Sequence, residues 1–226
     1  MEDKFEKIKD IVKDELKECS AHDFDHVMRA YNMALHLAEN EKVDLEVIKM
    51  ASLLHDIGGK KEIDDPTGKT DHAIESAKMA KPILKELEFS DDKINHICDC
   101  IISHRYKTEN QPKTLEAKIL FDADKLDAVG AFGLARGFAW VGKNRAHIYK
   151  KVENIEDYIK DNLEGGRLNG RIKDKTKHSA HIEFEIKMKH LLNKLYTDKA
   201  KEIGEKRIKF SKDFLDRMDK EAKGEI

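Results

Sequence analysis

Two adjacent polar residues, His55 and Asp56, interrupt an apolar run that begins at Leu53 and otherwise has the pattern of a buried helix end. Burying an imidazole and a carboxylate without partners is costly. A divalent metal ion would remove that cost, because neutral imidazole and ionised carboxylate are both good ligands for first-row metals. Gly58 and Gly59 would then let the backbone turn away from the site. The alternative is a helix cap or a core histidine that is hydrogen-bonded within the protein.

A second candidate ligand precedes this pair. Asp23 and Asp25 both have the capping propensity that favours a helix start, and a helix beginning there places His26 and Arg29 one turn apart. We expect His26 to face inward. Its alternative role is that of a core histidine bonded to a backbone carbonyl.

Three carboxylates, Asp122, Asp124 and Asp127, stand among apolar and small residues rather than on a solvated face. In a helix, Asp124 and Asp127 share one side and Asp122 points away. At least one of these carboxylates is expected to enter the core, where it would need a cation.

Further polar residues lie at expected helix ends. His72 follows the expected cap at Thr70 or Asp71, and His104 ends another helix, where a protonated imidazole also gains from the helix dipole. Lys60 belongs to a predicted loop, Gly58 to Gly68, and is either solvated or within reach of a bound phosphate.

Together, His26, His55, Asp56 and Asp124 supply two imidazoles and two carboxylates from three helices. Such a set suits a catalytic divalent metal better than a structural zinc, because it contains no thiolate and leaves room for water and substrate. The reaction class that it serves is hydrolysis of a phosphoester or phosphoanhydride.

The elements that must position these residues are helical. Apolar residues at helical spacing predict an all-α fold in one domain, with a metal-binding core over about 20–140, a mobile connection or lid over about 142–179, and C-terminal helices over about 180–222. The basic segment 167–177 is solvated or covers a phosphate site. The helices are expected over about 3–17, 23–37, 45–55, 71–82, 91–103, 114–121 and 155–163, and then on both sides of a break at Thr197-Asp198.

The composition excludes several classes of protein. The chain has 226 residues, 39% of them charged and only three of them proline, with a net charge of -2. A net charge this close to zero predicts no overall electrostatic attraction to nucleic acid or to an anionic membrane. No run approaches the roughly 20 apolar residues of a membrane span, and Met1-Glu2-Asp3 begins no signal peptide, so we expect a cytoplasmic protein. Both a monomer and a homodimer are compatible with the sequence. We also expect its cysteines, Cys19, Cys98 and Cys100, to be reduced thiols.

Four segments in this order resemble the HD-domain metal-dependent phosphohydrolases, and most closely a bacterial and archaeal branch similar to nucleotide pyrophosphohydrolases. They are His22-Asp-Phe-Asp-His26-Val-Met-Arg29, Leu54-His55-Asp56-Ile57-Gly58, Ile102-Ser103-His104, and the run from Leu115 through Asp124-Lys-Leu-Asp127 to Gly130. The resemblance covers residues 20 to 140 strongly and extends more weakly through His181 and the C-terminal helices. Arg105-Tyr106 departs from the serine and aromatic residue that near relatives commonly have after the histidine.

The resemblance implies an HD-type helical bundle with additional N- and C-terminal helices. It implies that a divalent ion (Mn, Mg, Co, Ni or Fe) is held by His26, His55, Asp56 and Asp124, and that Asp56 also orients or deprotonates the attacking water. Asp124 is preferred to Asp122 because Lys125-Leu126 follows it, as in the family. The candidates for substrate contact, proton transfer or a second metal are His22, Arg29, Lys60, His72, His104 and Lys125.

The predicted substrate is a small phosphorylated molecule, most naturally a nucleotide, and the enzyme would be a pyrophosphohydrolase or a nucleotidase. The main alternative is a non-catalytic module that uses the same ligands to sense a metal or nucleotide. A helical interaction protein without a site would not explain buried polar residues on separate helices.

Overall fold

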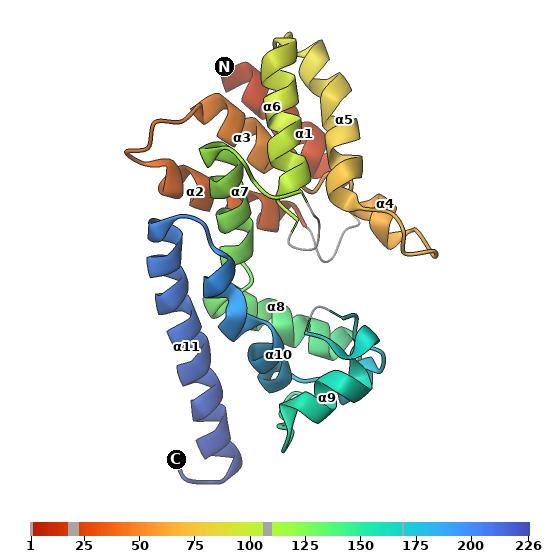
Figure 1. The fold of residues 1–226 in the computed structure, drawn as a ribbon, viewed down its shortest axis with the longest axis vertical. Helices are drawn as coiled ribbons and strands as arrows, with labels where there is room; N and C mark the ends of the chain where they lie inside the picture. Colours follow the sequence, from red (N-terminus) through yellow and green to blue (C-terminus); the bar gives the residue numbers. More distant parts are fainter. Residues whose placement is uncertain (1, 18–22, 106–109, 169) are drawn as a thin grey trace. The chain divides into compact units, whose positions relative to one another are not determined.

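The computed structural model describes residues 2–17, 23–105, 110–168 and 170–226, and within these ranges the chain is helical without a β-strand (Figure 1). The predicted all-α fold class is confirmed. The chain divides into two compact units, Met1–Asp124 and Lys125–Ile226. The prediction that the chain forms one domain remains a prediction.

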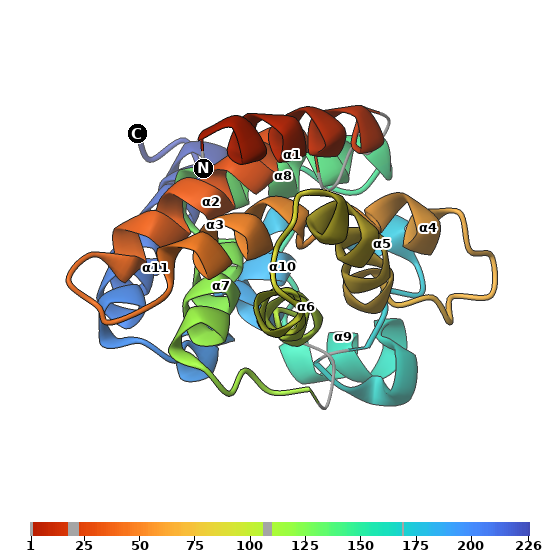
Figure 2. The ribbon, with the colours of Figure 1, turned by 90° about the horizontal axis from the view of Figure 1, so that it is seen from above.

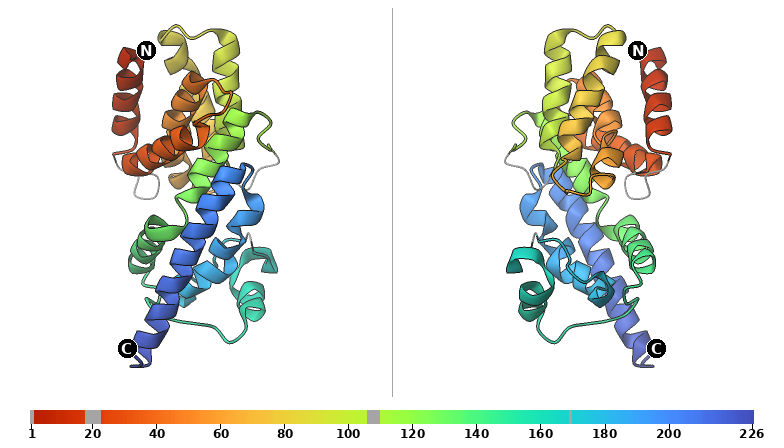
Figure 3. Two further views of the ribbon diagram at one scale, coloured as in Figure 1. Left: turned by 90° about the vertical axis from the view of Figure 1, so that its left-hand side faces the viewer. Right: turned by 90° about the vertical axis from the view of Figure 1, so that its right-hand side faces the viewer.

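The first unit is a bundle built around α3. This helix packs against α1, α2 and α6, and α5 packs along α6 as an antiparallel neighbour (Figures 2 and 3). Leu53, Leu54 and Ile57 belong to the apolar core, so the segment that contains His55 and Asp56 is anchored on both sides by buried side chains. The helices of this unit are α1 (Glu2–Glu15), α2 (Phe24–Ala38), α3 (Leu45–Leu54), α4 (Gly59–Ile63), α5 (His72–Glu86), α6 (Asp91–Ser103) and α7 (Leu115–Leu126), the last of which continues two residues into the second unit.

Side-chain caps fix where the site-bearing helices begin. The carboxylate of Asp23 accepts a hydrogen bond from the backbone N–H of His26 at 2.7 Å, which confirms the predicted cap and places His26 in the first turn of α2. Asp71 accepts from the backbone N–H of Ala73 at 2.9 Å, so His72 is the first residue of α5.

Two expected boundaries were wrong. The predicted loop from Gly58 to Gly68 contains a helical turn, α4, closed by backbone hydrogen bonds such as that from Asp64 N to Lys60 O at 2.9 Å. The helix that begins at His72 does not stop at Pro82 but runs to Glu86. Proline removes one backbone hydrogen bond, but the buried residues Ala80 and Leu84 hold this part of α5 in the core.

Gly58 is required for a close approach rather than for a turn. Its φ is -86°, which any residue can adopt. A Cβ atom at this position would lie 2.6 Å from the backbone nitrogen of Ser76 and 2.9 Å from the carbonyl carbon of Glu75. The backbone N–H of Gly58 also donates to Ser76 Oγ at 2.9 Å. The chain after the His-Asp pair is therefore pressed directly against α5.

The second unit has its own packing. The backbone N–H of Gly130 donates to Ser211 Oγ at 2.9 Å, which ties α8 to α11. Within the segment expected to be a mobile connection, Tyr158 and Leu163 pack with Ile182 and Ile186 in a second apolar cluster. The predicted short helix there is confirmed, whereas the mobility of the segment stays a prediction. The helices of this unit are α8 (Gly130–Lys143), α9 (Ile155–Asn162), α10 (Ala180–Ile186) and α11 (Asp198–Ala222), with 3-10 turns at Glu164–Gly166, Lys175–Lys177 and Met188–Lys194.

Two further expectations concern the whole chain. Across the described ranges, no helix combines the length and apolar character needed to cross a membrane. Cys98 and Cys100 are free and buried, and burial raises the pKa of the Cys100 thiol to about 12. Cys19 lies outside the described residues.

Gly58→Ala should lower the free energy of unfolding by about 2 kcal/mol or more, because the added methyl group meets backbone atoms that cannot rotate away. Urea denaturation followed by circular dichroism measures this change. Gly137→Ala is the matched control: it lies inside α8, nothing is within 4 Å of the added Cβ, and alanine should be neutral or stabilising by up to about 1 kcal/mol. Equal stability of the Gly58→Ala and wild-type proteins would contradict the close approach.

Candidate metal centre

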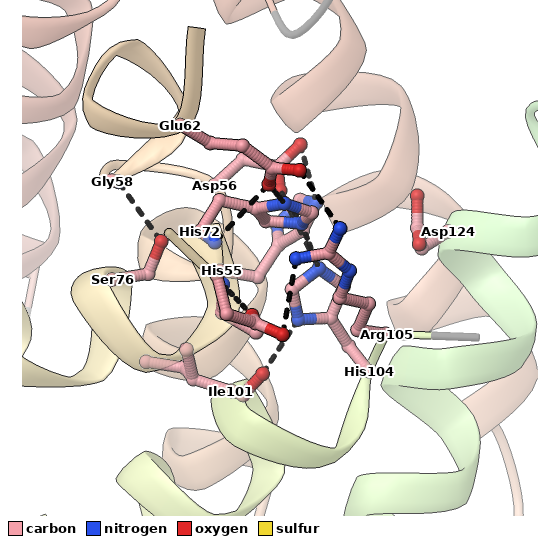
Figure 4. Close-up of polar contacts among 12 residues, drawn as sticks. His55, Asp56, Gly58, Glu62, His72, Ser76, Ile101, His104, Arg105 and Asp124 are labelled. Atoms are coloured by element: carbon pink, nitrogen blue, oxygen red, sulfur yellow. Dashed lines mark hydrogen bonds and ion pairs between the residues drawn. The ribbon is translucent and has the colours of Figure 1, made fainter. Parts of the chain in front are cut away.

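The four predicted metal ligands come together in the first unit from three helices. His26 lies in the first turn of α2. His55 is the C-terminal cap of α3 with Asp56 directly after it, and Asp124 lies in the last turns of α7 (Figure 4). His26, His55 and Asp56 are each at most 1% exposed. The side chain of Asp124 is 14% exposed, which makes it the most exposed of the four proposed ligands.

One oxygen of Asp56 faces the first pair of histidines. Asp56 Oδ2 lies 3.5 Å from His26 Nε2 and 3.4 Å from His55 Nε2. His26 Nε2 lies 3.3 Å from Asp124 Oδ1. Ligand atoms of His26, His55 and Asp124 all lie within 4.8 Å of one another, close enough to hold one ion.

The other oxygen of Asp56 faces a second pair. Asp56 Oδ1 lies 3.4 Å from His72 Nε2 and 3.4 Å from His104 Nε2. These two nitrogens are 3.2 Å apart. Sequence reasoning assigned His72 and His104 to substrate contact or a second metal, and the structure brings both to the carboxylate of Asp56.

In two of the imidazoles, a hydrogen bond made by Nδ1 determines whether Nε2 carries a lone pair that can bind a metal ion. His55 Nδ1 donates to the carbonyl oxygen of Ser52 at 2.8 Å, and His104 Nδ1 donates to that of Ile101 at 2.5 Å. Burial lowers the pKa of His55 to about 4, so the ring is neutral at pH 7. A neutral ring that donates through Nδ1 presents a lone pair at Nε2. His55 Nε2 is buried and makes no hydrogen bond with the residues that the structure describes.

His72 has the same arrangement with a different acceptor. Its Nδ1 donates to the carboxylate of Glu62, which leaves the lone pair of Nε2 directed toward Asp56 Oδ1 and His104 Nε2 (Figure 4). With both Nδ1 atoms donating, neutral rings would bring three acceptor atoms together: the Nε2 atoms of His72 and His104 and Oδ1 of Asp56. Acceptors brought this close repel one another unless a cation lies among them.

The donor set fits divalent metal ions. Two ligand atoms bound to one ion at about 2.0–2.2 Å are separated by about 3 Å or slightly more. The imidazole–carboxylate pairs of the centre are 3.3 to 3.5 Å apart. Imidazole and carboxylate without thiolate suit Mn, Fe, Co, Ni or Zn. The two oxygens of Asp56 face different histidine pairs, so the residues fit either one ion or two ions that share this carboxylate.

Sequence reasoning missed Glu62, which organises one edge of the centre. Besides His72, Glu62 binds the Arg105 guanidinium at 2.8 Å, and Arg105 also lies 3.0 Å from Asp71. Burial alone would raise the pKa of Glu62, but the hydrogen bonds from His72 and the positive charge of Arg105 hold it below its usual value. The sequence feature that could have identified Glu62 is its position along the chain, between the candidate ligands Asp56 and His72.

The cationic candidates lie in different environments. Arg29 is half-buried on α2, Lys125 is half-buried directly after Asp124, and Lys60 is exposed on α4. Asp122 and Asp127 are buried, and Asp127 pairs with Arg136 at 2.6 Å rather than with an imidazole of the centre. His22 and Tyr106 lie outside the described residues.

Comparison with known proteins finds similar sequences and similar structures. The chain is 28% identical to the uncharacterized protein YpgQ of Bacillus subtilis (strain 168) over 208 residues. The aligned region covers 92% of this chain and 87% of YpgQ. An HD-superfamily hydrolase from Bacillus thuringiensis has a similar crystal structure, with a TM-score of 0.70, 26% identity and coverage of 98% of both chains. The crystal structure of B. subtilis YpgQ in complex with ADP gives a TM-score of 0.68 at 23% identity, over 97% of this chain and 95% of YpgQ.

The model of the HD-domain family matches residues 23–129, a range that contains every proposed ligand from His26 to Asp124. Residues 23–129 are therefore identified as an HD domain.

Proposed function

We propose that this protein is a metal-dependent phosphohydrolase that acts on a nucleotide. The observation that carries the proposal is the buried carboxylate of Asp56, whose two oxygens face imidazole nitrogens of two separate histidine pairs. Such a centre needs cations to be stable, and it leaves coordination positions for water and substrate near the partly exposed Asp124.

Two comparisons support the reaction and the substrate class. The Bacillus thuringiensis relative is an HD-superfamily hydrolase, and YpgQ was crystallised with ADP. Both observations were made on the relatives and not on this chain. For this chain they favour hydrolysis of a phosphoanhydride or phosphoester in a nucleotide, either as a pyrophosphohydrolase or as a nucleotidase.

The residues divide the work as follows. A divalent ion in this centre would polarise a phosphoryl oxygen and lower the pKa of a water molecule. Asp56 and the imidazoles would hold the ions, and the hydrogen bonds of His55 and His104 to backbone carbonyls would fix their rings. Arg29 and Lys125, each beside a proposed ligand on its helix, would offset negative charge on the phosphate.

We further propose that the centre holds two ions. The first would be bound by His26, His55, Asp56 and Asp124, and the second by Asp56, His72 and His104. The first position uses ligands from α2, α3 and α7, whereas the second depends on α5 and α6.

Asp56→Ala should abolish metal-dependent release of phosphate or pyrophosphate from nucleotides. A ligand shared by both ions is removed, so the loss should exceed the roughly 10- to 100-fold typical of residues that only orient a ligand. The assay uses a nucleotide panel with Mg, Mn, Co and Ni, and its product separates a pyrophosphohydrolase from a phosphatase. Glu75→Gln, which alters a surface carboxylate paired with Lys61 and Lys78, is the control and should keep activity. Tight binding of nucleotide by the wild-type protein without turnover would instead support a sensor.

Metal should also stabilise the fold. At a free Mn²⁺ concentration of 100 times the dissociation constant, binding to the folded state alone adds about 2.7 kcal/mol to the free energy of unfolding. Denaturation of the wild-type protein in Mn²⁺ and in excess EDTA measures the difference. Asp124→Asn should lose most of this stabilisation and His104→Gln only the part due to the second ion. No effect of Mn²⁺ on the wild-type protein would refute the metal centre.

A further inference from the structure

Glu62 connects a proposed ligand to an arginine. Its Oε2 accepts hydrogen bonds from the ring Nδ1 of His72 and from the backbone N–H of the same residue, the latter at 3.2 Å. Its Oε1 accepts from Arg105 at 2.8 Å, and the other terminal nitrogen of Arg105 lies 3.0 Å from Asp71 (Figure 4). Arg105 is therefore held between two carboxylates, in a side chain that is only 17% exposed.

His72 needs such a partner because of its place in its helix. His55 and His104 both cap the C-terminal ends of helices, where each ring donates to the carbonyl three residues earlier. His72 is the first residue of α5, so no preceding helical turn offers it a carbonyl. A side chain from another segment must accept the Nδ1 proton, and α4 supplies Glu62.

The acceptor also differs in charge. A carboxylate that accepts the Nδ1 proton raises the basicity of the opposite ring nitrogen more than a neutral carbonyl does, and it fixes the ring plane. The second ion position is therefore the one whose affinity depends on a residue that is not itself a ligand. Arg105 keeps that carboxylate in place from the end of α6, which also carries His104.

We propose that Glu62, held by Arg105, is a positioning residue that sets the affinity of the second ion position, formed by Asp56, His72 and His104. The inference rests on the proposed function, since it concerns the same metal centre. It also gives a role to Arg105: the guanidinium orients Glu62 and is not available as a phosphate ligand.

The test is a titration of the metal-free full-length protein with Mn²⁺, followed by calorimetry and by electron paramagnetic resonance. The wild-type protein should bind two ions and show the spectrum of a spin-coupled Mn pair. Glu62→Gln, which keeps the size but removes the charge, should weaken the second binding step by about 10- to 100-fold and leave the first step unchanged. The coupled signal should then disappear at Mn²⁺ concentrations that saturate the wild-type protein.

Two variants separate positioning from general damage. Arg105→Lys keeps the positive charge but cannot bridge two carboxylates with a planar fork, so it should weaken the second step less than Glu62→Gln does. Glu75→Gln changes a carboxylate of α5 that pairs with surface lysines, and both binding steps should be retained. Loss of both steps in Glu62→Gln, or unchanged affinity for both ions, would overturn the proposal. A wild-type protein that binds one ion and still hydrolyses nucleotides would overturn it while leaving the hydrolase intact.

Discussion

The centre depends on one electrostatic constraint: a carboxylate that is 1% exposed, Asp56, faces the Nε2 atoms of four histidines at 3.4 to 3.5 Å. The Nδ1 atoms of His55 and His104 donate to backbone carbonyls, and these hydrogen bonds keep both rings in this orientation. An arrangement of this kind is unfavourable in the absence of cations, so the packing of the bundle must hold it. The apolar residues Leu53, Leu54 and Ile57 on both sides of the pair provide that packing.

Two of the imidazoles are oriented by the same local device. Helices α3 and α6 end at His55 and His104, and each ring donates to the carbonyl oxygen three residues earlier, in the last helical turn. The polar groups of a helix end are thereby satisfied by the residue that also faces Asp56. His72 stands at a helix start, where the unsatisfied backbone groups are N–H donors. The acceptor for its ring therefore comes from another helix, as the side chain of Glu62 on α4.

Much of the helical framework could be predicted from the sequence, because apolar periodicity and capping residues such as Asp23 and Asp71 act locally. The convergence of His26, His55, Asp56 and Asp124 was inferred from residue type and from family resemblance. Periodicity shows which face of a helix is buried but not which faces meet. For that reason the sequence did not reveal that His72 and His104 face the second oxygen of Asp56, nor that Glu62 on α4 reaches His72.

The separation of the ligands along the chain has a consequence for unfolding. His26 and Asp124 stand near opposite ends of the matched HD domain, yet their ligand atoms are 3.3 Å apart. An ion bound to both would act as a removable cross-link that closes most of the first unit into a loop, much as a disulfide does, and the entropy gained on opening a loop of that length is large. Chelation of the ion would thus remove a cross-link between α2 and α7. The rate of proteolytic cleavage of the first unit would then depend on the metal supply as well as on the packing of the apolar core of that unit.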